Sequence, residues 1–253
     1  MDAPTTARAR IRAELTREIK DEARRQLAVE GAPALSLRAV ARELGMVSSA
    51  LYRYFASRDD LLTALIIDAY DAIGAAAEAA DRSCDHGDHE ARWMAIGRAI
   101  RRWALEHPHE YALVYGSPVP GYRAPSETIV PASRVTLILA GLVADAYWAG
   151  ALVAPPDLPP TPPQLRREAK RIAAEAMGGV PAQLVVRALM AWTQIFGIVS
   201  FELFGHLVGV VEDREGFFDQ SLRLTGEEIG LAIISPVPSR PRARSRGRAP
   251  QGR

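Results

Sequence analysis

Hydroxyl, phenol and guanidinium groups gather in one short stretch of the chain, from Ser48 to Arg53. Serine and tyrosine hydroxyls can donate hydrogen bonds to phosphate oxygens, and an arginine can bind a guanine edge through two parallel hydrogen bonds. Phosphate contacts fix the register of a protein on DNA, whereas base-edge contacts carry the sequence information. The stretch therefore indicates DNA binding, with Arg53 as the candidate base-reading residue.

Two short predicted helices joined by a glycine turn position these side chains. Ser36 is expected to cap the first helix by accepting a backbone N–H that has no partner inside the helix. The apolar face of this helix is formed at helical spacing by Leu37, Val40, Ala41 and Leu44. Gly45 follows, where the end of a helix favours a positive φ. The second helix is predicted to begin near residues 47–49 and to end at Phe55, with Leu51 and Phe55 buried.

A pair of helices joined by about three or four residues is typical of a helix-turn-helix. The alternative is a structural hairpin without a role in DNA binding, because helical bundles contain such pairs as well. A first helix over residues 8–30 is expected to pack four apolar residues onto this unit, namely Ile11, Leu15, Ile19 and Leu27. Ser57, followed by Asp59 and Asp60, is expected to begin a long helix that runs to about residue 80 and links two domains.

The run from Ile11 to Leu62 resembles the N-terminal domain of the TetR (tetracycline-repressor-like) transcriptional regulators. The matching pieces are LSLRAVA at residues 35–41, the glycine at 45, LYRYF at 51–55 and SRDDLL at 57–62. Two later segments resemble the ligand domain of one actinobacterial-looking branch of that family, namely WALEHPHEY at 103–111 and GSPVPGY at 116–122. The resemblance implies a ligand-responsive regulator of transcription, with repression as the family's usual direction.

The resemblance also implies roles for individual residues of the helix-turn-helix. Ser36 and Arg38 correspond to positions that cap the first helix of the motif and contact phosphate. The positions that grip the DNA backbone beside the reading helix are occupied by Tyr52, Tyr54 and Arg58. The face expected to approach base edges carries Ser48, Ser49, Ala50 and Arg53.

The sequence departs from the family pattern at two positions. Val47 stands where a serine or threonine is usual, and Ser49 where a glycine is frequent. Because a valine side chain accepts no hydrogen bond, Val47 can neither cap the second helix nor bind a phosphate. The cap is therefore expected to move to Ser48.

The composition predicts an all-α protein. Ala, Leu, Arg and Glu dominate the 253 residues, and the alternation typical of strands is scarce. We expect a DNA-binding domain over residues 1–60, a ligand-binding and dimerisation domain over 61–234 and a disordered tail over 235–253. The helices expected in the larger domain cover residues 89–106, 108–115, 126–150 (kinked or split at Pro131), 163–177, 181–210 and 213–234. The proline-rich segment 155–163 is expected to be a surface loop.

The net charge of +1 is distributed unevenly. Residues 1–60 contain 11 Lys and Arg against 9 Asp and Glu, residues 61–234 contain 14 against 21, and residues 235–253 contain six Arg and no acidic residue. A DNA-binding domain with so small an excess must depend on where Arg38, Arg53 and Arg58 are placed. The basic tail is either a second, nonspecific DNA contact or a dispensable extension.

The segment 184–207 is apolar on nearly every side. Arg187 and Glu202 interrupt it, which leaves fewer uncharged residues than the ~20 that a membrane span needs. We therefore expect no membrane span, but burial against the protein's own core and against a second copy of the chain. Such a homodimer would place two reading helices about one DNA turn apart and require a palindromic operator in double-stranded DNA.

Aromatic residues in the larger domain suggest a cavity for a largely apolar or aromatic small-molecule effector. The predicted ligand-binding residues are Trp93, Trp103, His107, Tyr111, Tyr115, Tyr122, Trp148, Met190 and Gln194. For any single aromatic side chain, ordinary core packing is the alternative. Effector binding would act at a distance by changing the separation of the reading helices.

Two further groups of residues raise other chemistries. Residues 84–89 (CDHGDH) crowd potential metal ligands together, but their spacing matches no closed site, so no metal and no cofactor are expected. His107 beside Glu106 suggests acid–base chemistry, yet no nucleophile motif or phosphate-binding loop accompanies it, so we expect no catalytic residues and no enzyme. The single Cys84 and the lack of a signal peptide's apolar segment favour the cytoplasm. A helical scaffold, or a helical enzyme that processes a small molecule without binding DNA, is the alternative function.

Overall fold

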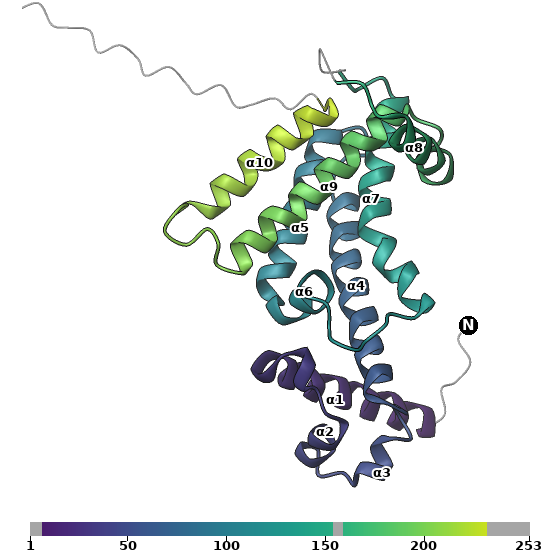
Figure 1. The fold of residues 1–253 in the computed structure, drawn as a ribbon, viewed down its shortest axis with the longest axis vertical. Helices are drawn as coiled ribbons and strands as arrows, with labels where there is room; N and C mark the ends of the chain where they lie inside the picture. The colour runs from purple at the N-terminus through teal and green to yellow at the C-terminus, as the bar shows by residue number, and fades with distance from the viewer. Residues whose placement is uncertain (1–6, 154–158, 232–253) are drawn as a thin grey trace, which may run out of the picture.

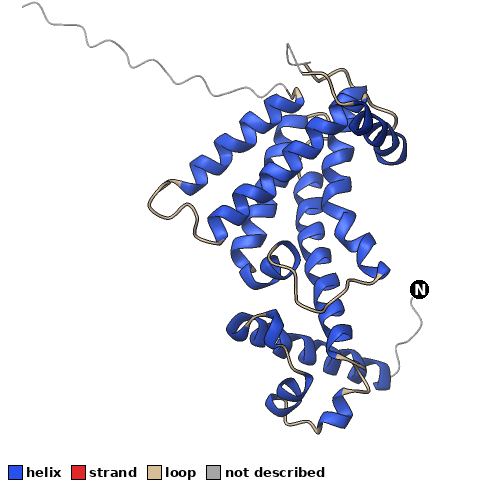
Figure 2. Cartoon of the chain, viewed as in Figure 1, coloured by secondary structure: helices blue, strands red, loops and turns tan. Residues whose placement is uncertain are grey.

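The computed structural model describes residues 7–153 and 159–231 (Figure 1). The all-α prediction is confirmed, because the described residues form ten α-helices, two short 3-10 turns and no strand (Figure 2). The elements are α1 (Ala7–Glu30), η1 (Ala32–Ala34), α2 (Leu37–Glu43), α3 (Ser48–Leu51), α4 (Arg58–Arg82), α5 (His89–Glu106), α6 (Pro108–Tyr115), η2 (Ser126–Thr128), α7 (Ile129–Trp148), α8 (Pro163–Ala176), α9 (Ala182–Leu203) and α10 (Arg214–Ile229). We call α1 to α3 the head and the helices from α5 onward the body.

Two serine caps define the helix-turn-helix as predicted. The backbone N–H of Ala39 donates to Ser36 Oγ at 3.5 Å, which caps α2, and the N–H of Asp60 donates to Ser57 Oγ at 3.1 Å, which caps α4. Gly45 adopts φ 64° between α2 and α3, a left-handed conformation that favours glycine. The two serine caps and the positive φ of the glycine are thus as the sequence predicts.

Helix α3, the predicted reading helix, differs from the prediction at both ends. It ends at Leu51 because the N–H of Tyr54 donates to the carbonyl of Leu51 at 2.8 Å, an i to i+3 bond that tightens the chain into a turn. At its start, Val47 is the N-cap and makes no side-chain cap bond, whereas Ser48 already lies inside the helix. The expected move of the cap to Ser48 is therefore wrong, and the first N–H groups of α3 have no side-chain cap.

The core of the head is built from α1, α2, α3 and the beginning of α4, and it includes Ile19, Leu27, Val40, Leu51 and Leu61. Of the four residues expected to pack from α1, Ile19 and Leu27 are buried and Leu15 is half-buried. Ile11 is 58% exposed, so its predicted packing is wrong. The adjacent Arg12 lies 5.1 Å from the centre of the Tyr54 ring, and neighbouring side chains on a helix diverge by about 100°, which turns Ile11 away from the head.

Helix α4 runs from the head into the body and packs against α5 and α7 (Figure 1). Near its middle, Gly74 makes room for Arg134 of α7, because a Cβ at Gly74 would come within 2.9 Å of that side chain. The Arg134 guanidinium donates to Asp71 Oδ1 at 2.7 Å and to both carboxylate oxygens of Glu78 at 2.9 Å. One arginine thus spans the glycine and holds the turns of α4 on both sides of it.

The body core combines residues from several helices, including Trp93, Tyr111, Leu142, Val199 and Phe218. The bounds of α5 and α6 agree with the prediction, whereas α9 and α10 are shorter. Helix α9 ends at Leu203 and is followed by turns in which Gly205 and Gly209 have φ 81° and 74°. Helix α10 ends before Gly230, which has φ 106°.

The proline predictions have mixed outcomes. The helix predicted over residues 126–150 consists of the 3-10 turn η2 and α7, and Pro131 does not kink α7, because it lies in the first turn, where a missing N–H breaks no bond inside the helix. Pro163 begins α8. Part of the proline-rich segment, residues 154–158, and the basic tail lie outside the described residues.

Two segments are long and apolar enough to cross a membrane by length and composition alone, namely Ser126–Trp148 and Ala182–Leu203. This is weak evidence for a membrane span, because core helices pass the same test. Both segments contribute to the body core through residues such as Leu142 and Val199, neither of which is exposed to solvent.

Candidate nucleic-acid interface

The predicted base-reading residues lie on and just beyond α3. Ser49 and Arg53 are exposed, and Ser48 and Ala50 are half-buried. Val47 is 71% exposed next to them and contributes an apolar surface where a hydroxyl was expected from the family pattern. Arg53 has the only cationic side chain between Val47 and Tyr54 in the sequence.

A hollow of about 460 Å³ lies between the start of α2 and the segment that joins α3 to α4. It brings together four predicted DNA-binding residues, Ser36, Arg38, Tyr52 and Arg58. Ser57 lines it as well, and no carboxylate in the described part of the chain does. Hydroxyl and guanidinium donors around a concave, acid-free surface suit a phosphate oxygen.

Arg58 is already engaged within the head. Its Nη2 donates to the carbonyl of Ala32 at 2.8 Å and to that of Pro33 at 3.4 Å, and its Nε donates to the carbonyl of Leu35 at 3.1 Å. Its Nη1 also donates to Asp59 Oδ1 at 3.3 Å. Arg58 thus fastens the beginning of α4 to the linker that precedes α2, and it supports Ser36 and Arg38 through that linker.

Arg12 is a residue that sequence reasoning missed. From α1 it donates through Nη2 to the carbonyl of Arg53 at 3.2 Å, and its guanidinium lies over the ring of half-buried Tyr54. A cation over an aromatic face is favourable. No motif could have revealed the contact, because it joins two segments that come together only in the folded head.

The predicted ligand residues fall into different parts of the body. Trp93 and Tyr111 are buried in the core, where Trp93 Nε1 donates to the carbonyl of Leu222 at 2.8 Å and Tyr111 Oη lies 3.0 Å from the carbonyl oxygen of Phe196. Trp103 is also buried, and its ring lies 5.3 Å from that of His107. These contacts are those of a satisfied core.

The remaining predicted ligand residues lie nearer the surface. Trp148 and Met190 are 64% and 52% exposed. Gln194 is exposed and accepts a hydrogen bond from Thr225 Oγ1 at 2.8 Å. Tyr122 Oη lies 2.9 Å from Thr63 Oγ1. The nine residues therefore do not converge on one enclosed space.

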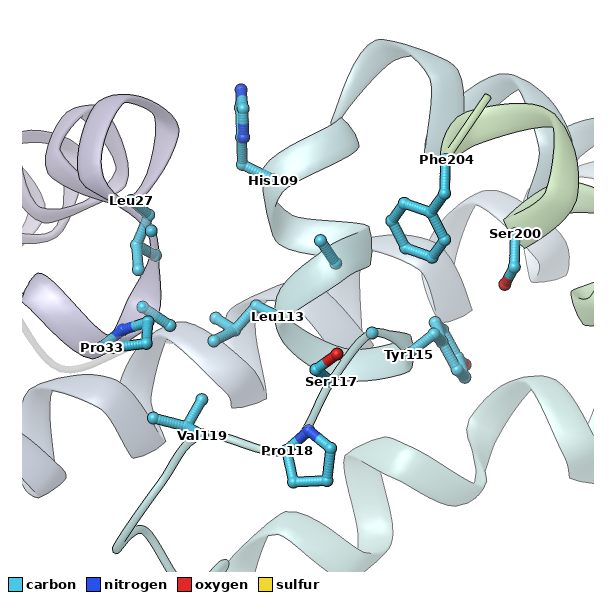
Figure 3. Close-up of a pocket in the computed structure, with 14 residues that line it drawn as sticks. Leu27, Pro33, His109, Leu113, Tyr115, Ser117, Pro118, Val119, Ser200 and Phe204 are labelled. Atoms are coloured by element: carbon cyan, nitrogen blue, oxygen red, sulfur yellow. The ribbon is translucent and has the colours of Figure 1, made fainter. Parts of the chain in front are cut away.

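The hollows of the body separate three of these residues. Trp103 lines a groove of about 510 Å³ between α4 and α5, and Met190 lines a hollow of about 280 Å³ beside α9. Tyr115 lines a cleft of about 700 Å³ that lies between the head and the body (Figure 3). The walls of this cleft come from α1, η1, α6, α9 and residues 116–119. The ligand-domain segments 103–111 and 116–122 pointed to its body side, but its head side lies far away in the sequence and no local pattern pointed to it.

The residues that suggested a metal have other partners. Asp88 caps α5 by accepting the N–H of Ala91 at 2.9 Å, and Asp85 accepts the N–H of Gly87 at 2.8 Å. His86 Nδ1 lies 3.0 Å from Arg92 Nη1, which also donates to Asp145 at 3.1 Å. Among the described residues, no group of three or more His, Cys, Asp or Glu is placed to hold a metal ion.

Two protein-family models match the chain. One, described as "Bacterial regulatory proteins, tetR family", matches residues 19–65, and the other, described as "Tetracyclin repressor-like, C-terminal domain", matches residues 93–225. The chain belongs to the TetR family. The resemblance seen over residues 11–62 is therefore confirmed, and the helix-turn-helix of the head is the DNA-binding element of a TetR-family transcriptional regulator.

Related sequences and solved structures extend this likeness over most of the chain. HTH-type transcriptional regulators of Mycobacterium tuberculosis (Rv1816) and Mycobacterium bovis (Mb1846) are each 38% identical over 221 residues, which cover 84% of this chain and 91% of the relative. The solved structure of regulatory protein SCO4313 is 35% identical, with a TM-score of 0.71 over 87% of this chain and 98% of its own. A protein with unknown function from Rhodococcus sp. RHA1 is 25% identical, with a TM-score of 0.63 over 87% and 96%.

TetR-family membership favours the regulator over the alternative of a helical scaffold without DNA binding. Regulators of this family bind DNA operators, typically as homodimers, and are typically not enzymes. Their action on DNA implies the cytoplasm as the place where they work.

Proposed function

We propose that this TetR-family regulator is a repressor that binds a palindromic operator as a homodimer and leaves it when a small-molecule effector binds. The observation that carries the operator contact is the acid-free hollow of the head, where Ser36, Arg38 and Tyr52 surround a space suited to a phosphate group. Repression and release by an effector follow the usual behaviour of the family.

Within the head, we assign different roles to the predicted DNA-binding residues. Exposed Arg53 reads a base edge, with Ser48, Ser49 and Ala50 beside it on α3. Arg38 and Tyr52 contact phosphate from the rim of the hollow. Arg58 acts mainly by holding the hollow in shape, because three backbone carbonyls already accept its hydrogen bonds.

The surface of α9 and α10 supports the homodimer. Large apolar side chains remain exposed on these two helices, namely Met190, Phe201, Phe217 and Leu224. Apolar area of this kind is costly to leave in water and is typical of an interface between subunits. A second copy placed on this surface would complete a four-helix arrangement and pair two heads.

Selection of bound genomic fragments tests the proposed function. The full chain is incubated with sheared DNA of the source genome, and the retained fragments are sequenced. We expect enrichment of a palindromic sequence whose binding weakens as salt rises. Binding releases counterions from the DNA, and this release is less favourable at high salt concentration. The double variant Arg38→Ala/Arg53→Ala serves as the control and should enrich nothing. Equal enrichment by both proteins, or none by either, would contradict the proposal.

A further inference from the structure

The cleft between the head and the body has walls from both domains (Figure 3). Leu27 at the end of α1 and Pro33 in η1 form the wall on the head side, whereas Ser200 and Phe204 at the end of α9 form the wall on the body side. Leu113 of α6 lies between the two walls (Figure 3). A molecule in this cleft would therefore contact the DNA-binding domain and the body at the same time.

The chemistry of the cleft restricts what it can bind. Its volume of about 700 Å³ falls within the range of pockets for small molecules, about 300–1,000 Å³. Among the described residues, its lining includes no Asp, Glu, Lys or Arg, and the polar side-chain groups are the imidazole of His109 and the hydroxyls of Tyr115, Ser117 and Ser200. Burial raises the pKa of the Tyr115 hydroxyl, which therefore stays protonated as a potential donor. A charged ligand would find no partner of opposite charge in this lining.

We propose that this cleft binds an uncharged, largely apolar small molecule with at least one hydrogen-bonding group, and that the bound molecule changes how the head is held against the body. This inference rests on the proposed ligand response and gives it a location outside the aromatic core of the body. The apolar walls would supply most of the contacts to such a molecule, and one or two hydroxyls would fix its orientation by hydrogen bonds, as in other small-molecule sites.

The head side of the cleft is connected directly to the DNA-binding surface. The carbonyls of Ala32 and Pro33, two residues that line the cleft, accept hydrogen bonds from Arg58. Arg58 in turn lines the hollow that contains Arg38. A ligand that displaces η1 would therefore shift Arg58 and the shape of that hollow through a single side chain.

Ionic, hydrogen-bonded and apolar contacts hold the two domains in register on the α6 side, and Tyr122 Oη lies 2.9 Å from Thr63 Oγ1. Arg24 of α1 lies 3.7 Å from Glu110 of α6 through its Nε, while its Nη2 is 2.6 Å from Asp68 of α4. Leu113 and Val119 also pack against the core of the head. Because this seam is partly ionic and partly exposed, a ligand wedged beside it can compete with its contacts.

Binding of Nile red, an uncharged apolar dye whose fluorescence rises and shifts to the blue in an apolar site, tests the location. The full chain should bind one dye per chain with saturation. Ala112→Phe fills the cleft from α6 and should weaken dye binding by about tenfold or more. Ala95→Phe is the matched control, because Ala95 is also a half-buried helical alanine but lines the groove between α4 and α5. This control should bind dye within about twofold of the unchanged protein.

A second variant guards against misfolding. Circular dichroism checks that both variants keep their helices. Phe204→Ala removes a 45% exposed wall of the cleft, whose ring centre lies 6.4 Å from that of buried Tyr111. Phe204→Ala should also weaken dye binding. Equal dye binding by the unchanged protein, Ala112→Phe and Phe204→Ala would overturn the inference, as would a lack of saturable binding by the unchanged protein.

Operator binding separates this inference from the proposed function. Without dye, all of these proteins should bind the selected operator. Saturating dye should change the operator Kd of the unchanged protein and of Ala95→Phe, but not that of Ala112→Phe. If dye binds in the cleft and the operator Kd does not change, the coupling is wrong. If the unchanged protein binds dye as expected but no DNA, the cleft stands as a ligand site and the repressor proposal fails.

Discussion

Arg38 and Arg53 are both exposed, yet their guanidinium groups are expected to affect DNA binding in different ways. A base contact discriminates between sequences, whereas a phosphate contact strengthens binding to every sequence. The two residues therefore allow the assignments in the head to be tested against each other with the same substitution.

We expect Arg53→Ala to cost about 1–3 kcal/mol at one base position of the operator and to relax the preference there. Arg38→Ala should weaken binding to all sequences alike and flatten the dependence of log K on log salt by about one unit. Binding assays with single-base operator variants at several salt concentrations measure both effects. If Arg53→Ala kept the base preference of the unchanged protein, the proposed base-reading role of Arg53 would be wrong.

Arg58 illustrates a residue whose position in a motif does not reveal what it touches. Its side chain donates to three carbonyls of the linker before α2, so its loss would remove the hydrogen bonds that fasten this linker to the beginning of α4. We expect Arg58→Ala to lower the free energy of unfolding by about 1–3 kcal/mol, measured by urea denaturation. Arg58→Lys should recover only part of this loss, because an ammonium group lacks the planar fork of a guanidinium.

Arg42→Ala provides the control for this measurement. Arg42 is exposed, and within the described residues its side chain pairs only with the neighbouring Glu43, so its loss should cost less than about 0.5 kcal/mol. If Arg58→Ala were as stable as Arg42→Ala, the positioning role of Arg58 would be wrong and a direct phosphate contact would be favoured.

At the scale of the elements, the shortest α-helix of the described residues is α3, which carries the residues proposed to read DNA. Helix α3 contains only four residues, and the side chain of its N-cap Val47 offers no acceptor to the N–H groups of the first turn. Val47 has φ −70° and ψ 136°, the extended conformation that capping residues adopt. The backbone is thus ready for a cap that the side chain cannot supply.

We expect Val47→Ser to raise the free energy of unfolding by about 1 kcal/mol, because a serine hydroxyl can accept the free N–H of α3. Val47→Ala has no acceptor and serves as the matched control. Thermal unfolding of both variants measures the difference. An equal melting temperature for the two would show that the start of α3 gains nothing from a cap.

Local signals predicted the elements well where the cause is local. Capping serines, the glycine turn and helical apolar spacing set α2, α5 and the start of α4 within a residue or two. The predictions failed where a contact between distant segments determines burial, as at Ile11, or where a turn determines the end of a helix, as in α3 and α9. The cleft is the extreme case, because its lining joins segments from Leu27 to Phe204.

At the scale of the whole molecule, the exposed apolar surface of α9 and α10 needs an explanation. The hydrophobic free energy of exposed area is about 25 cal/mol per Å², so several exposed large side chains favour association. Phe201 of α9 is 56% exposed, and Leu137 of α7 is exposed to a similar extent, at 51%. The two residues form a matched pair inside and outside the proposed interface.

We expect the unchanged protein to scatter light as a dimer at micromolar concentration and Phe201→Glu to shift it toward the monomer, because a buried, unpaired carboxylate is costly. Leu137→Glu should remain dimeric. Salt-dependent operator binding should weaken in Phe201→Glu, since a single head contacts half of a palindrome. A monomeric unchanged protein would contradict the homodimer.

The arginine that spans Gly74 gives α4 a mechanical role. Helix α4 has 25 residues, and a rise of about 1.5 Å per residue makes it about 37 Å long. Without Arg134 and its bonds to Asp71 and Glu78, the glycine would be a soft point at which this rod could flex. With these hydrogen bonds in place, a tilt of the rigid helix by about 5° about its body end moves its head end by about 3 Å. The helix therefore works as a stiff lever, and in a dimer two such levers would change the spacing of the heads by twice the displacement of one.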